Sequence, residues 1–210
     1  MSQLVWFLHF IVAILIVLSV HESSHALMAY YLGDPTAKNQ GRISLNPVRH
    51  LDLMGSMVFL ITQRIGWGKP VPVNPNNFQN PVKDNALTAL AGPISNFILA
   101  FLIALPLKFL GPSLPLIVNY QLSLIFDVSV VLGVFNLIPL PPLDGSKVIG
   151  FFVPRKYYPQ YMRYLNEGSK YLMIWILFEM FFSDRIGFSL LYLIIERGYE
   201  FVSFILKMGV

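Results

Sequence analysis

The sequence predicts a mostly helical integral membrane protein, a polytopic helix bundle with short surface β-strands and one re-entrant segment. Of its 210 residues, 55% are hydrophobic and only 12% are charged, whereas about a quarter of the residues of a soluble domain are charged. Its mean hydropathy is +0.61, and connectors rich in Gly, Pro and Asn separate its long apolar stretches. We expect a single domain over residues 1–210, with a core over about 4–150 and C-terminal helices over about 165–207.

Three apolar stretches are long enough to cross a bilayer, which takes about 20 residues of helix. They are Leu4–Tyr31, Asn85–Leu107 and Pro115–Ile138. Two further apolar segments, Tyr171–Phe182 and Phe188–Leu206, are separated by "SDRIG". One broken helix, two short helices, or one span followed by an interfacial helix would each fit this C-terminal pattern.

The connectors between these stretches carry two weaker signals. In Gly41–Leu45 and Pro70–Val73, two kinds of residue alternate over a few positions, which predicts short strands at the membrane surface. His50–Gln63 is apolar over only about fourteen residues and contains Asp52 and Gly55, so it is short for a span. We therefore expect it to dip into the membrane and return, or to lie on the membrane surface.

Composition excludes some classes of site. The chain has no cysteine, which excludes disulfides, thiolate metal sites and a cysteine nucleophile. The formal charge of +4 needs no nucleic-acid partner, because basic residues in cytoplasmic loops account for it equally well. We therefore expect the lipid bilayer, and no nucleic acid, among its partners.

The stretch "HESSHA" near the end of the first apolar segment has the spacing of a metal site. His21 and His25 are four residues apart, which on a helix places both imidazoles on one face, one turn apart. That arrangement suits two ligands of one tetrahedral zinc ion. Glu22 lies about 100° around the helix, where its carboxylate can take a proton from a zinc-bound water. Three ionisable groups at this depth are expensive to keep without a function.

A catalytic zinc usually has a third protein ligand. Asp144 follows an apolar helix in "FNLIPLPPLDGSKV", where the prolines interrupt regular helix. Spacing alone ranks Asp144 first and Asp52 second, with His50 also possible. Asp127 lies within an apolar segment and Glu179 lies in the C-terminal region, and neither receives a role from its pattern.

Five motifs occur in order and cover most of residues 21–150: "HESSHA", "GRISLNPVRHLDLMGS", "GWGKPVPVNPNNF", "ALAGPISNFILA" and "FNLIPLPPLDGSKV". Together they resemble the site-2 protease family of intramembrane zinc metalloproteases, in its compact form without PDZ or CBS domains. The resemblance implies one zinc per chain, held by His21, His25 and Asp144, with Glu22 as catalytic base. It also implies hydrolysis of peptide bonds within or near the transmembrane helices of membrane protein substrates.

The resemblance suggests roles for two asparagines as well. Asn136, eight residues before Asp144, would position substrate or stabilise the oxyanion, since a negative charge that develops at low dielectric needs a donor. Asn96 in "GPISN" would line the same site and bind substrate. Helix capping or hydrogen bonds between helices would explain either asparagine too. The segments Gly41–Leu45 and Pro70–Val73 would offer an edge to an unwound substrate by strand addition.

Other functions fit the sequence less well. Ser113 in "GPSL" lacks the second glycine of a serine nucleophile motif, and the GxGD motif of aspartyl intramembrane proteases does not occur. A catalytically inactive membrane metal-binding protein or a metal transporter remains the alternative. Glu22 discriminates between these readings, because a transporter needs ligands, whereas a hydrolase also needs a base beside them.

The distribution of basic residues predicts the orientation of the chain. No basic residue precedes the first apolar segment, whereas residues 33–84 carry Lys38, Arg42, Arg49, Arg64, Lys69 and Lys83. The positive-inside rule then places the N-terminus outside a multi-pass cell-membrane protein and this connector in the cytoplasm, with the active site toward the cytoplasmic side. Because Asp144 must reach the same metal as the histidines, we expect that His50–Gln63 does not cross the membrane.

Overall fold

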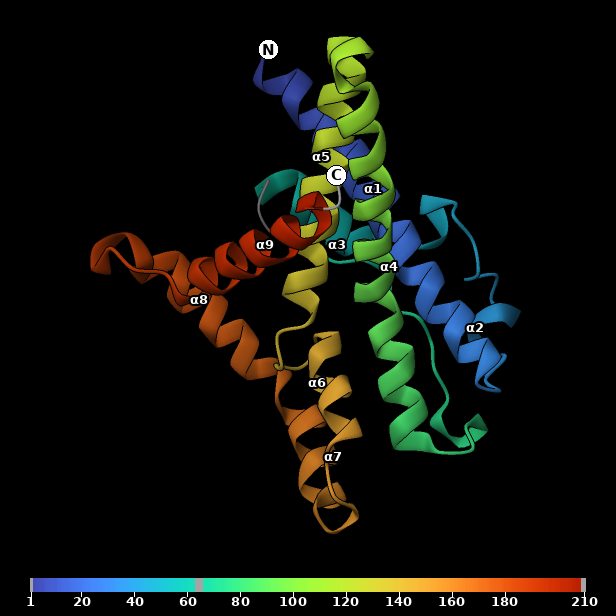
Figure 1. The fold of residues 1–210 in the computed structure, drawn as a ribbon. Coiled ribbons are helices and arrows are strands. Elements are labelled where there is room, and N and C mark those ends of the chain that lie inside the picture. Colours follow the sequence, from blue (N-terminus) through green and yellow to red (C-terminus); the bar gives the residue numbers. More distant parts are fainter. Residues whose placement is uncertain (1, 63–65, 209–210) are drawn as a thin grey trace.

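The structure, a computed structural model, describes residues 2–62 and 66–208, and long helices dominate it (Figure 1). In this part of the chain, three helices are long and apolar enough to cross a membrane: α1 (Gln3–Tyr31), α4 (Pro81–Leu110) and α5 (Leu116–Asn136). They correspond to the three predicted spans. The other described helices are α2 (Thr36–Asn39), η1 (Pro47–Arg49), α3 (Leu53–Thr62), η2 (Pro75–Asn77), η3 (Gly111–Ser113), α6 (Asp144–Val148), η4 (Ile149–Phe151), η5 (Arg155–Tyr157), α7 (Tyr158–Glu167), α8 (Ser169–Ile186) and α9 (Leu190–Met208).

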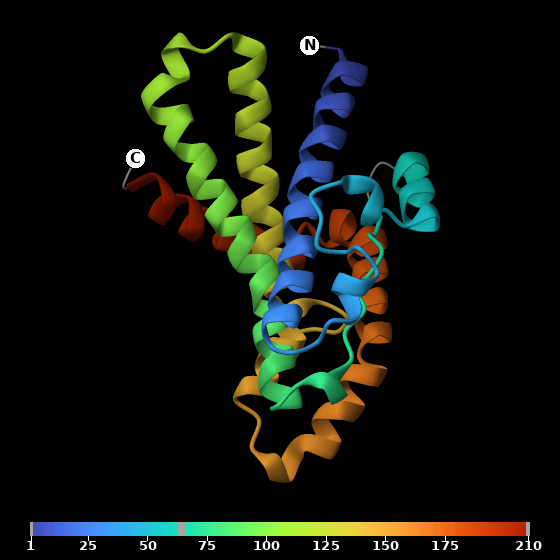
Figure 2. The ribbon, with the colours of Figure 1, turned by 90° about the vertical axis from the view of Figure 1, so that its right-hand side faces the viewer.

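Helices α1, α4 and α5 pack against one another, and the short α6 packs on α4 beside the C-terminal half of α1. α7 lies at the end of the molecule away from the N-terminus (Figure 2). Small residues line the contacts and let the helix backbones approach closely, as in other membrane bundles. The buried alanines of α1 and α4 are Ala13, Ala26, Ala29, Ala86, Ala89, Ala91, Ala100 and Ala104. Large apolar side chains such as Ile98 and Phe101 instead face outward, which suits a surface in contact with lipid.

Neither of the predicted strands forms. Gly41–Leu45 is a turn followed by irregular chain, and Pro70–Val73 is irregular throughout. Pro70 and Pro72 explain the second difference, because proline has no N–H to donate to a strand ladder. Within the described residues, strand-like pairing is limited to one isolated antiparallel bridge.

That bridge joins Leu51 to Gly68, one on each side of the short helix α3. The N–H of Lys69 also donates to the carbonyl of His50 at 2.8 Å. The two ends of the segment that contains α3 therefore lie side by side, as expected of a chain that departs and returns on one side of the molecule. The predicted end of this segment, Gln63, lies outside the described residues, and the entry of α3 into the membrane stays a prediction.

The C-terminal segment forms two helices. Gly187 follows the end of α8 with a φ of 68°, a left-handed conformation that glycine adopts readily, and α9 begins at Leu190. One carboxylate oxygen of Glu179 accepts hydrogen bonds from the N–H groups of Leu190 and Leu191, so that α8 caps the start of α9. The pair extends away from the three long helices, and α9 returns to pack on α5 (Figure 1).

Candidate metal centre

Three ligand atoms converge where the C-terminal half of α1 meets α4 and α6. Nε2 of His21 lies 3.0 Å from Nε2 of His25. Oδ2 of Asp144 lies 3.2 Å from the first nitrogen and 3.0 Å from the second. All three side chains are buried. Among the described residues, no other set of three His, Cys, Asp or Glu side chains could hold a metal ion.

The spacing of these atoms fits a tetrahedral metal ion. Bonds of about 2.0–2.1 Å to nitrogen and oxygen separate neighbouring ligands of a tetrahedron by about 3.3 Å, close to the 3.0–3.2 Å seen here. Oδ2 of Asp144 is buried and has no hydrogen-bond partner, which is unfavourable for a carboxylate oxygen unless a cation or proton lies against it. The residues present therefore fit a bound metal.

Two groups of helix α4 contact the Nδ1 atoms of the two imidazoles, the ring nitrogens that do not face the other ligands. Nδ1 of His25 donates to the backbone carbonyl of Thr88 at 2.7 Å, so Nε2 is left with its lone pair facing the centre. The side-chain amide of Asn96 lies 3.1 Å from Nδ1 of His21, and Asn96 is fully buried. Contacts of this kind orient metal ligands and fix their tautomer.

Gly92, between Thr88 and Asn96 along α4, lets that helix come close to the ligands. A Cβ at this position would lie 2.6 Å from Cε1 of His21 and would also overlap Nε2 of His25. Any other residue would push α4 away and break both of the contacts that orient the imidazoles. Glycine is therefore required here for packing, although its cost to an ordinary helix is about 1 kcal/mol.

The short helix α6 brings in the third ligand. Asp144 is its first residue, and the following Gly145 packs against the end of α5, where a Cβ would lie 2.6 Å from the carbonyl oxygen of Ile138. Nζ of Lys147 lies 3.8 Å from Oδ1 of Asp144, the oxygen that does not face the histidines. The break predicted from the prolines thus turns the chain back so that the carboxylate points at α1.

The predicted catalytic residues lie on the same helices. Glu22 follows His21 on α1, is half-buried and makes no side-chain hydrogen bond with the described residues. Asn136 is the last residue of α5, and its Nδ2 donates to the carbonyl of Leu132 at 3.0 Å, within its own helix. A contact between Asn136 and substrate stays a prediction and would require the amide to turn away from Leu132. Substrate binding by Asn96 stays a prediction as well.

The other candidates from the sequence make contacts elsewhere. Asp52 accepts a hydrogen bond from an N–H in the first turn of α3, and Nε2 of His50 donates to a loop carbonyl. Asp127 of α5 accepts a hydrogen bond of 2.6 Å from the hydroxyl of Tyr199 on α9, and Glu179 caps α9. None of these four belongs to the cluster of ligands.

Sequence reasoning did not single out Thr88 or Gly92. Thr88 acts through its backbone carbonyl, so its residue type carries no signal. Gly92 lies in "ALAGPISN", four residues before Asn96 and four after Thr88. This spacing places the three residues on one face of a helix, and a glycine on such a face signals close approach of another element.

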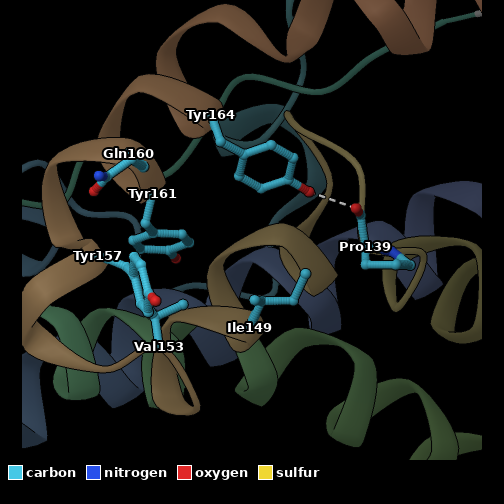
Figure 3. A pocket seen from close by; sticks show the side chains of 7 residues that line it. All are labelled: Pro139, Ile149, Val153, Tyr157, Gln160, Tyr161 and Tyr164. Atoms are coloured by element: carbon cyan, nitrogen blue, oxygen red, sulfur yellow. Dashed lines mark hydrogen bonds between the residues drawn. The ribbon is translucent and has the colours of Figure 1, made fainter.

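A shallow, open hollow of about 540 Å³ lies beside α6 and is separate from the ligands (Figure 3). It is lined by Pro139, Ile149, Val153, Tyr157, Gln160, Tyr161 and Tyr164. The hydroxyl of Tyr161 donates to the carbonyls of Ser146 and Lys147, at 3.2 and 3.1 Å. This wall of the hollow is therefore tied to the helix that carries Asp144, and through it to the metal centre.

A bundle of apolar helices with a His-Glu-x-x-His motif on one helix and a third ligand on another defines a membrane metalloprotease. Over 197 residues the chain is 34% identical to a Bacillus subtilis protein named "Putative zinc metalloprotease YwhC", a match that covers 90% of this chain and 87% of that protein. The chain belongs to the site-2 protease family.

More distant relatives carry the same description. The chain is 32% identical over 132 residues to Rip2 of Mycolicibacterium smegmatis, a match that covers 61% of this chain and 51% of Rip2. It is 35% identical over 68 residues to MJ0611 of Methanocaldococcus jannaschii, which covers 32% of this chain and 34% of that protein. No protein-family model matches the sequence, and no solved structure matches it significantly.

Proposed function

We propose that this chain is a zinc-dependent intramembrane endopeptidase that hydrolyses peptide bonds within or near the transmembrane segments of membrane proteins. The observation that carries the proposal is the convergence of His21, His25 and Asp144, with Glu22 on the helix that holds the two histidines. Three ligands with an adjacent base are what hydrolysis by a metal-activated water requires. The names of the relatives support zinc as the metal, and a single cluster in the described residues supports one ion per chain.

Each residue of the site has a defined task. When bound, zinc polarises the scissile carbonyl and lowers the pKa of its water to about 7. His21, His25 and Asp144 hold the ion. Glu22 takes a proton from the attacking water and delivers it to the departing amine nitrogen, so that one carboxylate serves as base and then as acid. Negative charge develops on the carbonyl oxygen, and the side-chain N–H of Asn136, turned toward the site, would stabilise it.

The substrate must be unwound before it is cleaved, because a transmembrane helix keeps its carbonyls in internal hydrogen bonds. An unwound segment needs new backbone partners, which strand addition can supply. The segment Pro70–Val73 is suited to this role although it forms no strand by itself, because the N–H groups of Val71 and Val73 make no hydrogen bond within the described part of the chain. Extended substrate would supply the pairing that these two N–H groups do not find among the described residues.

We place the protein in the cell membrane as a multi-pass protein, with its N-terminus outside and its active site toward the cytoplasm. The ligand histidines lie in the C-terminal half of α1, and the basic connector follows directly after that helix. On the positive-inside rule, this end of the bundle faces the cytoplasm. Water can then reach the site from that side without crossing the hydrocarbon layer.

A comparison of the wild-type chain with Glu22→Gln tests the proposal. We expect the variant to bind zinc normally and to accumulate uncleaved membrane proteins in cells, since it keeps the ligands and loses only the base. Membrane proteomes of the two strains, with metal analysis of both purified proteins, provide the measurement. Identical proteomes with full zinc in both proteins would favour the alternative, a membrane protein that binds or transports metal without hydrolysis.

A further inference from the structure

Two buried charged side chains have no task in the mechanism above. Asp34 is fully buried and Arg42 is 2% exposed, and both lie in the connector that follows α1. A buried charge is unfavourable unless strong hydrogen bonds or an opposite charge offset its loss of water. Neither side chain forms a salt bridge with a described residue. Both make hydrogen bonds to residues 69–77 instead, and Asp34 also accepts hydrogen bonds from Thr36.

Arg42 holds the beginning of that segment. Its two terminal nitrogens donate to consecutive backbone carbonyls, Nη2 to Lys69 at 2.5 Å and Nη1 to Pro70 at 3.0 Å. The planar guanidinium suits two parallel acceptors, which the single ammonium of lysine cannot match. The N–H of Lys69 donates to the carbonyl of His50, so the backbone is fixed here on two sides.

Asp34 holds the other end. Its Oδ2 accepts a hydrogen bond of 2.7 Å from the N–H of Asn74, and its Oδ1 accepts one of 2.7 Å from Nδ2 of Asn77. Thr36 donates to Oδ1 as well. Burial would raise the pKa of Asp34, but these hydrogen bonds outweigh it and hold the pKa below its usual value. The carboxylate is therefore charged at neutral pH and available as an acceptor.

Three residues lie between the two fixed ends: Val71, Pro72 and Val73. Lys69 and Val71 each precede a proline, which disfavours helical backbone and biases the chain toward extended conformation. In an extended chain, residues two apart present their N–H and C=O groups on the same side. Val71 and Val73 thus offer their backbone groups along one edge, and their N–H groups have no partner in the part of the chain that the structure describes.

Arg42 also relates this segment to the catalytic residues. Burial lowers the pKa of the Arg42 guanidinium, and the negative charge of Glu22 partly offsets that effect. Geometry places the segment near the same helix: Gly68, directly before it, packs against Leu18 of α1, where a Cβ on Gly68 would lie 3.2 Å from Cδ2 of Leu18. Leu18 lies three residues, about one helical turn, before His21.

We propose that Asp34 and Arg42 are positioning residues for the substrate, which hold the two ends of residues 69–74 so that Val71 and Val73 present a free edge beside the metal centre. This inference rests on the proposed function and extends it. The prolines of the segment prevent it from pairing as a strand within the protein. Hydrogen bonds to the buried side chains of Asp34 and Arg42 hold it extended instead.

Binding of two zinc-directed probes separates this role from a general structural one. The first probe is acetohydroxamate, which chelates the metal and carries no peptide. The second is a hydroxamate that carries an extended peptide of three residues. In the purified, zinc-loaded full chain, Arg42→Lys and Asp34→Ala should weaken the peptidyl hydroxamate about tenfold, as expected for loss of hydrogen bonds to charged groups. Both should leave the affinity for acetohydroxamate unchanged.

Matched controls and a structural measurement complete the test. Arg49→Lys and Glu167→Gln alter exposed charges of the same types and should change neither affinity. Amide hydrogen exchange should accelerate at Asn74 in Asp34→Ala and at Lys69 in Arg42→Lys, with α1 and α4 unaffected. The milder Asp34→Asn replaces Asp34→Ala if that variant does not fold.

Two outcomes would overturn the inference. Equal losses for both probes would indicate general damage to the site, and unchanged affinity for the peptidyl probe would show that the segment does not bind extended peptide. Failure of both probes to bind the wild-type, zinc-loaded chain would instead contradict the metal centre and, with it, the proposed function.

Discussion

Nε2 of His25 lies 3.0 Å from Oδ2 of Asp144, and this contact joins α1 to α6, the short helix that follows α5 in the chain. α1 carries the imidazole and the short α6 carries the carboxylate, while Gly92 and Gly145 each lack a Cβ that would hold the helices apart. A buried carboxylate oxygen that faces two imidazole nitrogens is stable only if a proton or a cation lies between them. The metal content of variants therefore tests the centre directly.

Removing a ligand should remove zinc and activity together. We expect His21→Ala, His25→Ala and Asp144→Ala to lose both, because two remaining ligands hold zinc poorly. Metal analysis of the purified proteins provides the measurement, with Asp52→Ala as the control that keeps full zinc. Full zinc and full activity in Asp144→Ala would show that the third ligand is a different residue.

Asn96 should control zinc affinity through His21. With a metal on Nε2, Nδ1 of His21 carries the ring proton, so we expect the amide to present its oxygen to that nitrogen. Asn96→Leu should weaken zinc binding about 10–100-fold, the usual effect of losing such a partner. Asn96→Asp, which can only accept, should retain zinc. Competition with a fluorescent chelator measures the affinity, and equal affinities in Asn96→Leu and wild type would return Asn96 to a role in substrate binding alone.

Asn136 should act in turnover and not in metal binding. If its amide stabilises the oxyanion, Asn136→Leu should lower kcat about 10²–10³-fold with zinc content intact. Asn119→Leu removes a hydrogen bond at the other end of α5 and serves as the control with unchanged kcat. Normal turnover in Asn136→Leu would leave Asn136 with only its contact to Leu132.

Tyr161 should stabilise the helix that carries Asp144. Burial raises the pKa of Tyr161 to about 12, above the value of about 10 for an unfolded chain. Its contribution to stability is therefore complete below pH 10 and is lost as the pH rises toward 12. At neutral pH, Tyr161→Phe should cost about 1 kcal/mol and speed zinc loss to a chelator several-fold. Tyr157→Phe, at an exposed position of the same hollow, should not change that rate.

The segment that contains α3 should return to the side from which it departs. Single cysteines can be placed freely in this cysteine-free chain. In intact cells, a membrane-impermeant thiol reagent should miss Asn39→Cys and Asn76→Cys and label Ser113→Cys, which lies at the opposite end of α4. Opening the membrane should expose all three. Labelling of Asn76→Cys but not Asn39→Cys in intact cells would show that the segment crosses.

The sequence predicted those parts of the molecule that depend on side-chain type at a regular spacing. Long apolar runs predicted α1, α4 and α5, and the motif around His21 and His25, with Asp144 after the prolines, named the three residues that the structure brings together. The sequence could not predict contacts that are made by backbone groups, such as the carbonyl of Thr88. The predicted strand at Pro70–Val73 was wrong because Pro70 and Pro72 have no N–H for a strand ladder. Arg42 donates hydrogen bonds to one end of the segment and Asp34 accepts them from the other, and alternation of residues cannot reveal such contacts.

The groups of α4 that contact the two histidines are neutral, and this affects the net charge of the metal, its ligands and the base. Thr88 offers a carbonyl and Asn96 an amide, and neither carries a formal charge. A divalent cation is then matched by the carboxylates of Asp144 and Glu22, so the metal, its ligands and the base together sum to zero, while Lys147 lies 3.8 Å from the other oxygen of Asp144. During turnover the sum is kept, because Glu22 gains a proton as the substrate carbonyl gains negative charge. A set of metal, ligands and base with zero net charge needs no counter-ion of its own from the solvent at the margin of a hydrocarbon layer.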